Sequence, residues 1–320
     1  MRRYLVKRLF AGLLTVFIIL TVNFIIIKIA PGNPIKTLMG KEHDNPELRS
    51  ALEEKYGLDE PLSVQYLVYL KLVFSGDLGT SIIYNRPVSN MISEGLKPTL
   101  LLVLGSTFFS LLIGTGSGVI AARREGSLFD MIFSGFAYLF NAIPSFWLGL
   151  MLIILFAVKL KWLPAYGMTD VRIPVAGFGY LMQVVRHMIL PMVTLILIQI
   201  PNYFRVTKSS ILQVKDEDYI MTLRATGMDE RMIFNKYILK NALLPVITLI
   251  GISMAYMITG VALTEIVFAW PGTGRMIVNA VSQRDYPVLM GIYLFASIVT
   301  AFVMLAMDII YCVLDPRIRY

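Results

Sequence analysis

The sequence predicts an all-α, polytopic membrane protein, and three observations support that prediction. Mean hydropathy is +0.69 over 320 residues, and only 16% of the residues are charged while 57% are hydrophobic. A soluble domain of this length does not combine so much apolar surface with so few charges. The apolar residues also fall into six long runs, each able to cross a hydrocarbon layer of about 30 Å as a helix. One transmembrane domain is therefore expected over residues 1–320.

Six spans follow from a requirement of about 20 apolar residues per helical crossing. The predicted spans are residues 9–30, 98–122, 131–158, 188–212, 243–268 and 288–313. The first run follows four basic residues within residues 2–8, as a secretory signal would. It is too long for a signal and lacks a small-residue cleavage site, so it is interpreted as the first span.

The basic residues predict which side of the membrane each loop faces. Short cytoplasmic flanks are rich in Lys and Arg, so the basic N-terminus is placed in the cytoplasm, and six crossings return the C-terminus there. Arg123 in the second connection, the bases of residues 213–241 and Arg317 near the C-terminus agree. Residues 31–97 form an extracytoplasmic loop long enough to cross regardless of charge. The net charge of +8 therefore indicates topology and contact with the lipid bilayer of the inner or plasma membrane, with no nucleic acid as partner.

A polar stretch, DYIMTLRATGMDERMIFNKYILKNALLP at residues 218–245, separates the fourth and fifth spans. Its local signals predict two short helices on the cytoplasmic side. Asp216 or Asp218 can cap the first helix, and Gly227 suits the left-handed residue that follows it. Asp229 can cap the second helix. The apolar residues of this stretch lie among charges, so a partner surface is expected to bury them.

This stretch resembles the cytoplasmic EAA loop of ABC importer permeases. Ala225 and Gly227 stand at the defining alanine and glycine, whereas Leu223 and Arg224 replace the first two residues of the triplet, as in the peptide-importer branch. In that family the two helices dock into a groove on the ATP-binding subunit. The residues that the resemblance assigns to this coupling, within residues 213–241, are Asp218, Tyr219, Thr222, Leu223, Arg224, Ala225, Thr226, Gly227, Met228 and Asp229.

Further motifs extend the resemblance, to the dipeptide/oligopeptide/nickel permease group, over nearly the whole chain. They are APGNP, YGLDEPLSVQYLVYL, GDLGTS, KWLPAYG, WPGTGR, RDYP and LDPRIRY, in this order. The resemblance implies a heterodimer with a second homologous permease subunit, two ATP-binding subunits, and an extracytoplasmic substrate-binding protein that delivers the cargo. Peptides are the implied cargo, with nickel chelates, glutathione and oligosaccharides left open. Residues 31–97 are expected to form a lid or a docking surface for the binding protein.

The sequence lacks motifs for nucleotide binding, for a disulfide and for metal binding. The phosphate-binding pattern G-x-x-x-x-G-K-[ST] occurs nowhere, so the chain is not expected to be an enzyme, and ATP with Mg²⁺ is expected on a partner. Cys312 is the only cysteine, and His43 and His187 lie far apart. A single cysteine excludes an intramolecular disulfide, and the distant histidines give no metal-ligand pattern. No cofactor and no metal are therefore expected in this chain.

Polar residues inside predicted spans are candidates for lining a translocation path. The selected candidates are Asn141, Ser253, Thr259 and Glu265. Gly114, Gly116 and Gly118 in the second span are interpreted instead as helix-packing positions. Two other classes of membrane protein would leave different patterns in the sequence. A self-contained secondary transporter would show internal repeats or matching interrupted helices, and a polytopic membrane enzyme would show convergent catalytic groups. Neither pattern is found.

Overall fold

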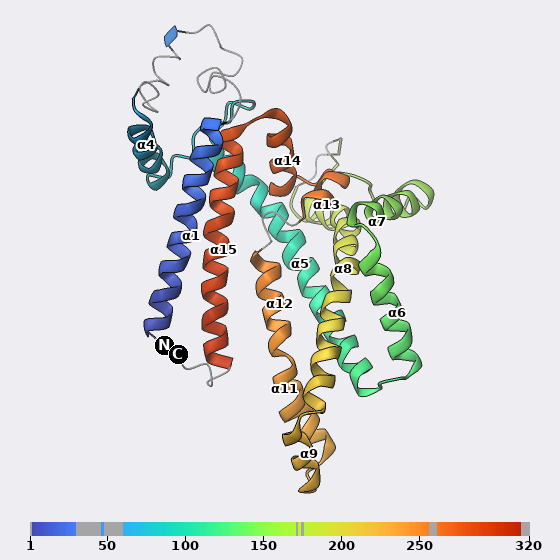
Figure 1. Ribbon diagram of the computed structural model, residues 1–320. Coiled ribbons are helices and arrows are strands. Elements are labelled where there is room, and N and C mark those ends of the chain that lie inside the picture. The colour runs from blue at the N-terminus through green and yellow to red at the C-terminus, as the bar shows by residue number, and fades with distance from the viewer. Residues whose placement is uncertain are drawn as a thin grey trace. The chain divides into compact units, whose positions relative to one another are not determined.

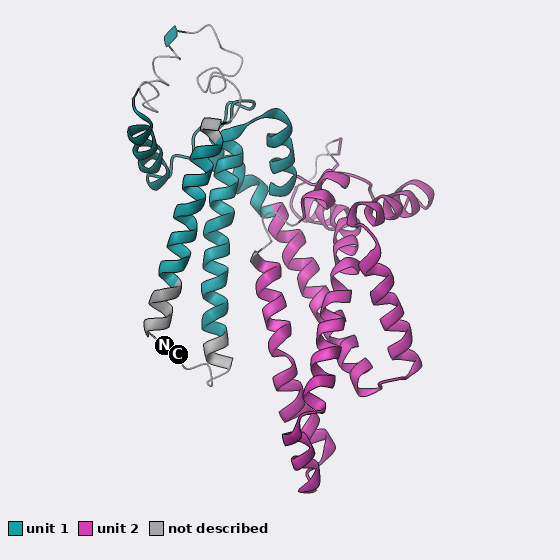
Figure 2. Cartoon of the chain, viewed as in Figure 1, with its two compact units in different colours: residues 1–97, 272–320 teal, residues 98–271 magenta. Residues whose placement is uncertain are grey.

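The computed structural model describes residues 2–29, 46–47, 60–170, 172–173, 176–255 and 261–314. Within these ranges the chain is helical, and its β structure is limited to an isolated bridge between Thr80 and Pro87. The chain divides into two compact units, Met1–Lys97 with Gly272–Tyr320 and Pro98–Pro271 (Figures 1 and 2). The boundaries of the predicted extracytoplasmic and coupling segments, 31–97 and 213–241, stay predictions, as does a single domain over residues 1–320.

Two long helices that lie side by side form the centre of unit 1 (Figure 2). α1 (Arg2–Ile29) packs along α15 (Tyr286–Leu314). The shorter α4 (Leu62–Phe74) contacts α1, and the Tyr66 hydroxyl lies 2.7 Å from the Thr21 hydroxyl. Part of the predicted outer loop is therefore helical. Residues 31–45 and 48–59 of that loop lie outside the described residues.

A tight turn before α5 is bonded, within unit 1, to the junction between α14 (Thr273–Gln283) and α15. Asp285 at this junction is 1% exposed. Its carboxylate accepts a hydrogen bond of 2.5 Å from the Ser81 hydroxyl and one of 3.3 Å from the Ile82 backbone N–H. The motifs GDLGTS and RDYP, far apart in the chain, therefore meet in one buried contact.

Unit 2 is assembled around α8 (Phe178–Lys215), which is 38 residues long. α6 (Leu128–Ala142), α7 (Ser145–Leu152) and α12 (Leu244–Ala255) all pack against it. α5 (Val88–Arg123) begins in unit 1 and continues through unit 2. Many large apolar side chains of these helices are exposed, and helices in a membrane associate through close van der Waals packing and hydrogen bonds.

Two glycines allow α5 and α8 to approach closely. A Cβ on Gly114 would lie 2.7 Å from the Tyr203 Cβ, and one on Gly118 would lie 2.8 Å from the Phe204 carbonyl oxygen. Both distances are shorter than real Cβ contacts, so any larger residue would push the helices apart. A Cβ on Gly116 would meet nothing within 4 Å. The helix-packing interpretation is confirmed for Gly114 and Gly118, and the structure gives Gly116 no such contact.

Five helices in the described part of the chain are long and apolar enough to cross a membrane. A sixth crossing exists if α6 is counted together with α7 and the π-helix η1 (Ile153–Lys159), which are bent by 103° relative to α6. The prediction of a continuous helix over residues 131–158 is therefore wrong. Ile143 is extended (ψ 125°) and precedes Pro144, and a residue before proline is driven out of the helical region.

The fifth span also differs from its prediction over residues 243–268. The helical stretch begins at Glu230 and runs on to Met254 as one candidate span, so the second cytoplasmic helix and the span are joined. This stretch is interrupted at Leu243, between α11 (Leu239–Ala242) and α12, and Pro245 lies in the first turn of α12, where proline is tolerated. Residues 256–260 lie outside the described residues. α13 (Ala262–Val267) then forms a separate short helix that packs against α7 and α8.

Candidate functional site

The predicted cytoplasmic element begins with α9 (Asp218–Ala225), and a glycine ends this helix. Gly227 has φ +77°, so the predicted left-handed conformation is confirmed. Its N–H donates to the Arg224 carbonyl at 3.0 Å, and the next N–H, of Met228, donates to the Leu223 carbonyl at 3.3 Å. These two bonds make a Schellman motif, which satisfies the last carbonyls of a helix.

The start of α9 differs from the prediction. Glu217 is the N-cap residue, and its side chain makes no capping hydrogen bond. Asp218 lies inside the first turn instead, where a negative charge complements the positive end of the helix. Neither Asp216 nor Asp218 therefore caps this helix. The N-cap is displaced because Asp216 already ends α8, as its C-cap residue.

The second helix of the element begins at its predicted cap. Asp229 is the N-cap residue, and its carboxylate accepts a hydrogen bond of 3.1 Å from the Met232 N–H. α10 (Glu230–Met232) continues into the π-helix η2 (Ile233–Ile238) and α11 (Leu239–Ala242). A π-turn inside a longer α-helix is uncommon and is found most often at functional sites. Sequence periodicity gave no sign of it.

An apolar cluster holds the two helices against the ends of α5 and α8. Ile220, Ile233 and Ile238 are almost fully buried there, together with Ala122 of α5 and Ile211 of α8. Leu223 and Met228 pack against this cluster and are half-buried. These two apolar residues were expected to need a partner protein for their burial, and the chain itself covers part of them. The element therefore has a core of its own within unit 2.

Polar contacts fix the two helices on each other. The Arg224 guanidinium donates to the Glu230 carboxylate at 2.8 Å, across the turn. The Asn241 side-chain amide donates to the Tyr219 hydroxyl at 3.1 Å. Both contacts are solvent-exposed, so each stabilises the pair by only a fraction of a kcal/mol to about 1 kcal/mol.

One residue of α5 contacts the π-helix directly. The Arg123 guanidinium lies over the Phe234 ring, 3.9 Å from its centroid, and donates to the Asn235 side-chain oxygen at 2.7 Å. A guanidinium above an aromatic face is attracted by the ring quadrupole. From the sequence, Arg123 indicated only the orientation of the chain in the membrane. Its contact with η2 could not be found there, because the two segments lie 112 positions apart.

The outer surface of the element remains uncovered. Met221 is 67% exposed, Met232 50% and Tyr219 40%. The other predicted coupling residues that stay exposed are Asp218, Thr222, Arg224, Ala225, Thr226, Gly227 and Asp229. Unbranched methionine side chains adapt to differently shaped partners, and they are common at such binding surfaces. The element thus presents apolar atoms beside charges of both signs.

Three of the four predicted path residues lie in the described part of the chain, on three different helices. Asn141 is exposed on α6, and the hydroxyl of Ser253 on α12 bonds a tyrosine hydroxyl of α8 at 3.1 Å. Glu265 on α13 has no exposed surface, and its carboxylate accepts a hydrogen bond of 2.6 Å from Thr99. No hydrogen bond links any two of these three described residues. Thr259 lies outside the described residues, and a path role for all four stays a prediction.

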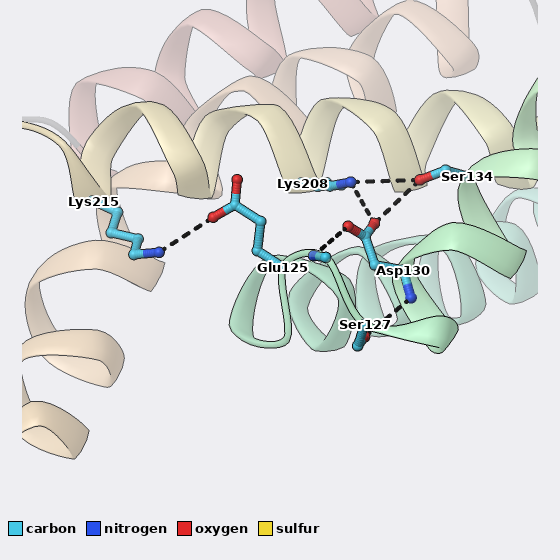
Figure 3. Close-up of polar contacts among 7 residues, drawn as sticks. Glu125, Ser127, Asp130, Ser134, Lys208 and Lys215 are labelled. Carbon is cyan, nitrogen blue, oxygen red and sulfur yellow. Dashed lines mark hydrogen bonds and ion pairs between the residues drawn. The ribbon is translucent and has the colours of Figure 1, made fainter.

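A buried ion pair between α6 and α8 was missed by the sequence analysis (Figure 3). The Lys208 ammonium donates to the Asp130 carboxylate. The same carboxylate accepts from the Ser134 hydroxyl at 3.2 Å and from the Gly126 N–H at 3.1 Å. Ser127 caps α6 by accepting from the Asp130 N–H at 3.3 Å. The carboxylate therefore has several charge-stabilising donors, as a buried charge requires.

A weaker pair lies beside it, with Lys215 and Glu125 3.4 Å apart (Figure 3). The available signal for the cluster was Lys208 itself, a basic residue inside the predicted fourth span. Ionisable groups within a span usually have a partner there. Its partner could not be identified, because Asp130 was one of several acids near the ends of the predicted spans.

Comparison with solved structures finds a similar fold. The inward-facing MetNI methionine ABC transporter, in its SeMet-soaked crystal form, matches with a TM-score of 0.54 and 19% identity, over 70% of this chain and 96% of that chain. At this identity the match shows the fold alone. It confirms the prediction of an all-α, polytopic membrane protein, while the position of the coupling helices is not tested by it.

Similarity in sequence extends over the full length. The chain is 37% identical to the dipeptide transport system permease protein DppB of Alkalihalophilus pseudofirmus and 37% to the oligopeptide transport system permease protein AppB of Bacillus subtilis, over 100% of both chains in each case. Residues 1–101 match the family model "Binding-prot-dependent transport system membrane comp, N-term". Residues 114–320 match the model "Binding-protein-dependent transport system inner membrane component". The chain therefore belongs to the family of binding-protein-dependent transport system inner membrane components.

Proposed function

We propose that this chain is the permease subunit of an ATP-driven importer of di- and oligopeptides. Its relatives with full-length similarity are named for dipeptide and oligopeptide transport, which favours peptides over nickel chelates, glutathione or oligosaccharides. The sequence carries no nucleotide-binding pattern, so the energy must enter from ATP and Mg²⁺ on separate subunits. The chain itself then forms part of the path for the peptide and couples transport to ATP hydrolysis, and it has no catalytic residues.

The observation that carries the coupling part of this proposal is the exposed face of the α9–α10 turn. Met221 and Met232 are largely exposed. The helices that carry them nevertheless have a buried apolar core and a hydrogen bond between Arg224 and Glu230. A surface that is rigid, apolar and flanked by charges fits a protein partner. We assign this face to the ATP-binding subunit. Asp218 to Asp229 then lie at or next to the interface.

The remaining assembly follows from the family and the predicted topology. A second homologous permease would pair with this chain, with two ATP-binding subunits on the cytoplasmic side, where both termini also lie. The substrate-binding protein would deliver peptide to residues 31–97 on the outer side. Asn141, Ser253, Thr259 and Glu265 remain the candidates for the path. Alternating access would require contacts at the coupling turn to differ between two global states.

The experiment is reconstitution of the complete transporter in liposomes. Wild-type complex should take up a labelled dipeptide and show ATP hydrolysis that the loaded binding protein stimulates. Met221→Asp with Met232→Asp should abolish both, because carboxylates would be buried against the partner. The matched control, Met221→Leu with Met232→Leu, keeps the apolar surface and should retain both. Normal uptake by the aspartate variant would refute the assigned interface, and uptake of sugars or nickel chelates in place of peptides would refute the cargo.

A further inference from the structure

The groove between α6 and α8, next to the buried ion pair, has the form of an amphipathic ligand site. Ser134 and Tyr138 line it from α6, and Pro201, Arg205 and Lys208 line it from α8. All of these residues belong to unit 2. The α8 residues recur at intervals of three or four positions, so they form one stripe along the helix. From Pro201 to Lys208 the stripe extends about 10 Å at 1.5 Å per residue.

Both polar and apolar residues line the groove. Along α8 the cations Arg205 and Lys208 lie between Pro201 and Leu212, and Lys208 meets Asp130 in the first turn of α6. On the side away from that turn, Pro201 and the buried Ala137 supply apolar lining. This side continues along α8, which contains a candidate membrane span. The groove therefore places charged residues next to an apolar surface.

The charges in the groove select an anion. Lys208 is neutralised by its ion pair with Asp130. Arg205 is exposed, its guanidinium donates to the Asn202 side chain at 3.2 Å, and among the described residues no carboxylate pairs with it. One net positive charge thus faces the opening. Tyr138 of α6, which is 73% exposed, also lines the groove.

We propose that this groove binds one anionic phospholipid. The phosphate lies against the Arg205 guanidinium, and an acyl chain runs along Ala137 and Pro201. A cation beside apolar lining fits this molecule, because a phospholipid carries its negative charge and its acyl chains on one molecule. A free phosphate would leave the apolar half unfilled. The lipid would contact α6 and α8 together, beside the coupling element.

The test measures lipid retention and thermal stability of the purified full-length chain, with any subunits that copurify. Native mass spectrometry counts bound phosphatidylglycerol, with phosphatidylcholine as the uncharged comparison. Wild-type protein should retain one phosphatidylglycerol and unfold at a higher temperature when it is added. Arg205→Gln should weaken this binding about fivefold, which corresponds to about 1 kcal/mol for one basic residue near an anionic headgroup.

Arg124→Gln is the matched control. It removes the same charge from an exposed position in the α5–α6 connection, outside the groove, and should leave phosphatidylglycerol binding unchanged. Equal losses in both variants would mean nonspecific attraction and would overturn the site. So would equal retention of phosphatidylcholine, or full competition by inorganic phosphate. Binding here requires α8 to cross the bilayer and is independent of the cargo, so a failed peptide-uptake assay would not affect it.

Discussion

Replacement of Gly227 tests whether the turn between the cytoplasmic helices couples ATP hydrolysis to transport. Its φ of +77° lies in the left-handed region, and a Cβ there would meet nothing within 4 Å. The cost of a side chain is therefore almost purely a backbone cost. For valine, which is β-branched, this cost is about 2 kcal/mol. If the turn must keep its shape to dock, about 2 kcal/mol corresponds to an affinity for the ATP-binding subunit that is about thirtyfold lower.

A graded series separates backbone strain from other effects. Gly227→Asn should be nearly neutral, because asparagine tolerates the left-handed conformation. Gly227→Ala should fall between asparagine and valine. The matched control is Gly126→Val, since Gly126 has φ +75° and equally open surroundings but lies in the α5–α6 connection. It carries similar strain outside the coupling element and should retain coupling.

The assay is uptake of labelled peptide and stimulated ATP hydrolysis in liposomes, with copurification of the ATP-binding subunits measured in parallel. Gly227→Val should still insert and fold, because the membrane helices do not depend on this turn. Docking, stimulated hydrolysis and uptake should fall together. If Gly227→Val transports like the parent, or if Gly126→Val fails in the same way, the turn is only a connection and the coupling assignment is incorrect.

Three further substitutions test the packing of unit 2, each by thermal unfolding of the purified protein. Gly118→Ala should destabilise it by about 1–3 kcal/mol through overpacking against α8, whereas Gly116→Ala, with open surroundings, should be neutral or stabilising by up to about 1 kcal/mol. Arg123→Gln removes the stacking on η2 and should cost about 1 kcal/mol, with Arg124→Gln unchanged. Thr99→Val removes a donor to a buried carboxylate at 2.6 Å and should cost about 1–3 kcal/mol. The contacts described would be contradicted if Gly116→Ala lost more stability than Gly118→Ala, or if Arg124→Gln lost more than Arg123→Gln.

The features that the sequence predicted correctly depend on residues close together in the chain. The left-handed Gly227 and the capping Asp229 are decided within one helical turn, so a reading of neighbouring residues suffices. Four of the spans lie within long helices for the same reason, since their apolar runs are continuous. The close approach at Gly114 and Gly118 followed from residue size alone.

The features that were missed depend on partners distant in sequence or on backbone detail. Pro144 was visible, but a single proline within an apolar run does not reveal a bend of 103°. The pairing of Asp130 with Lys208 joins residues 78 positions apart, and that of Ser81 with Asp285 joins residues 204 apart. Many donors could reach each carboxylate, and only the tertiary arrangement selects one of them.

The position of α10 and α11 directly before α12 bears on how the proposed coupling would work. Two separate helices on a loop could move without disturbing the membrane, because a flexible connection absorbs displacement. Here α10, η2, α11 and α12 follow one another within one candidate span, Glu230–Met254, interrupted only at Leu243, so a displacement of the α9–α10 turn would be passed on to α12. The Asn241–Tyr219 hydrogen bond ties α9 to α11. The π-helix η2 lies in between, and the irregular hydrogen bonding of a π-turn makes it the natural point of adjustment. Motion of the ATP-binding subunits would thus shift α12 directly, with Arg123 on η2 linking α5 to the same displacement.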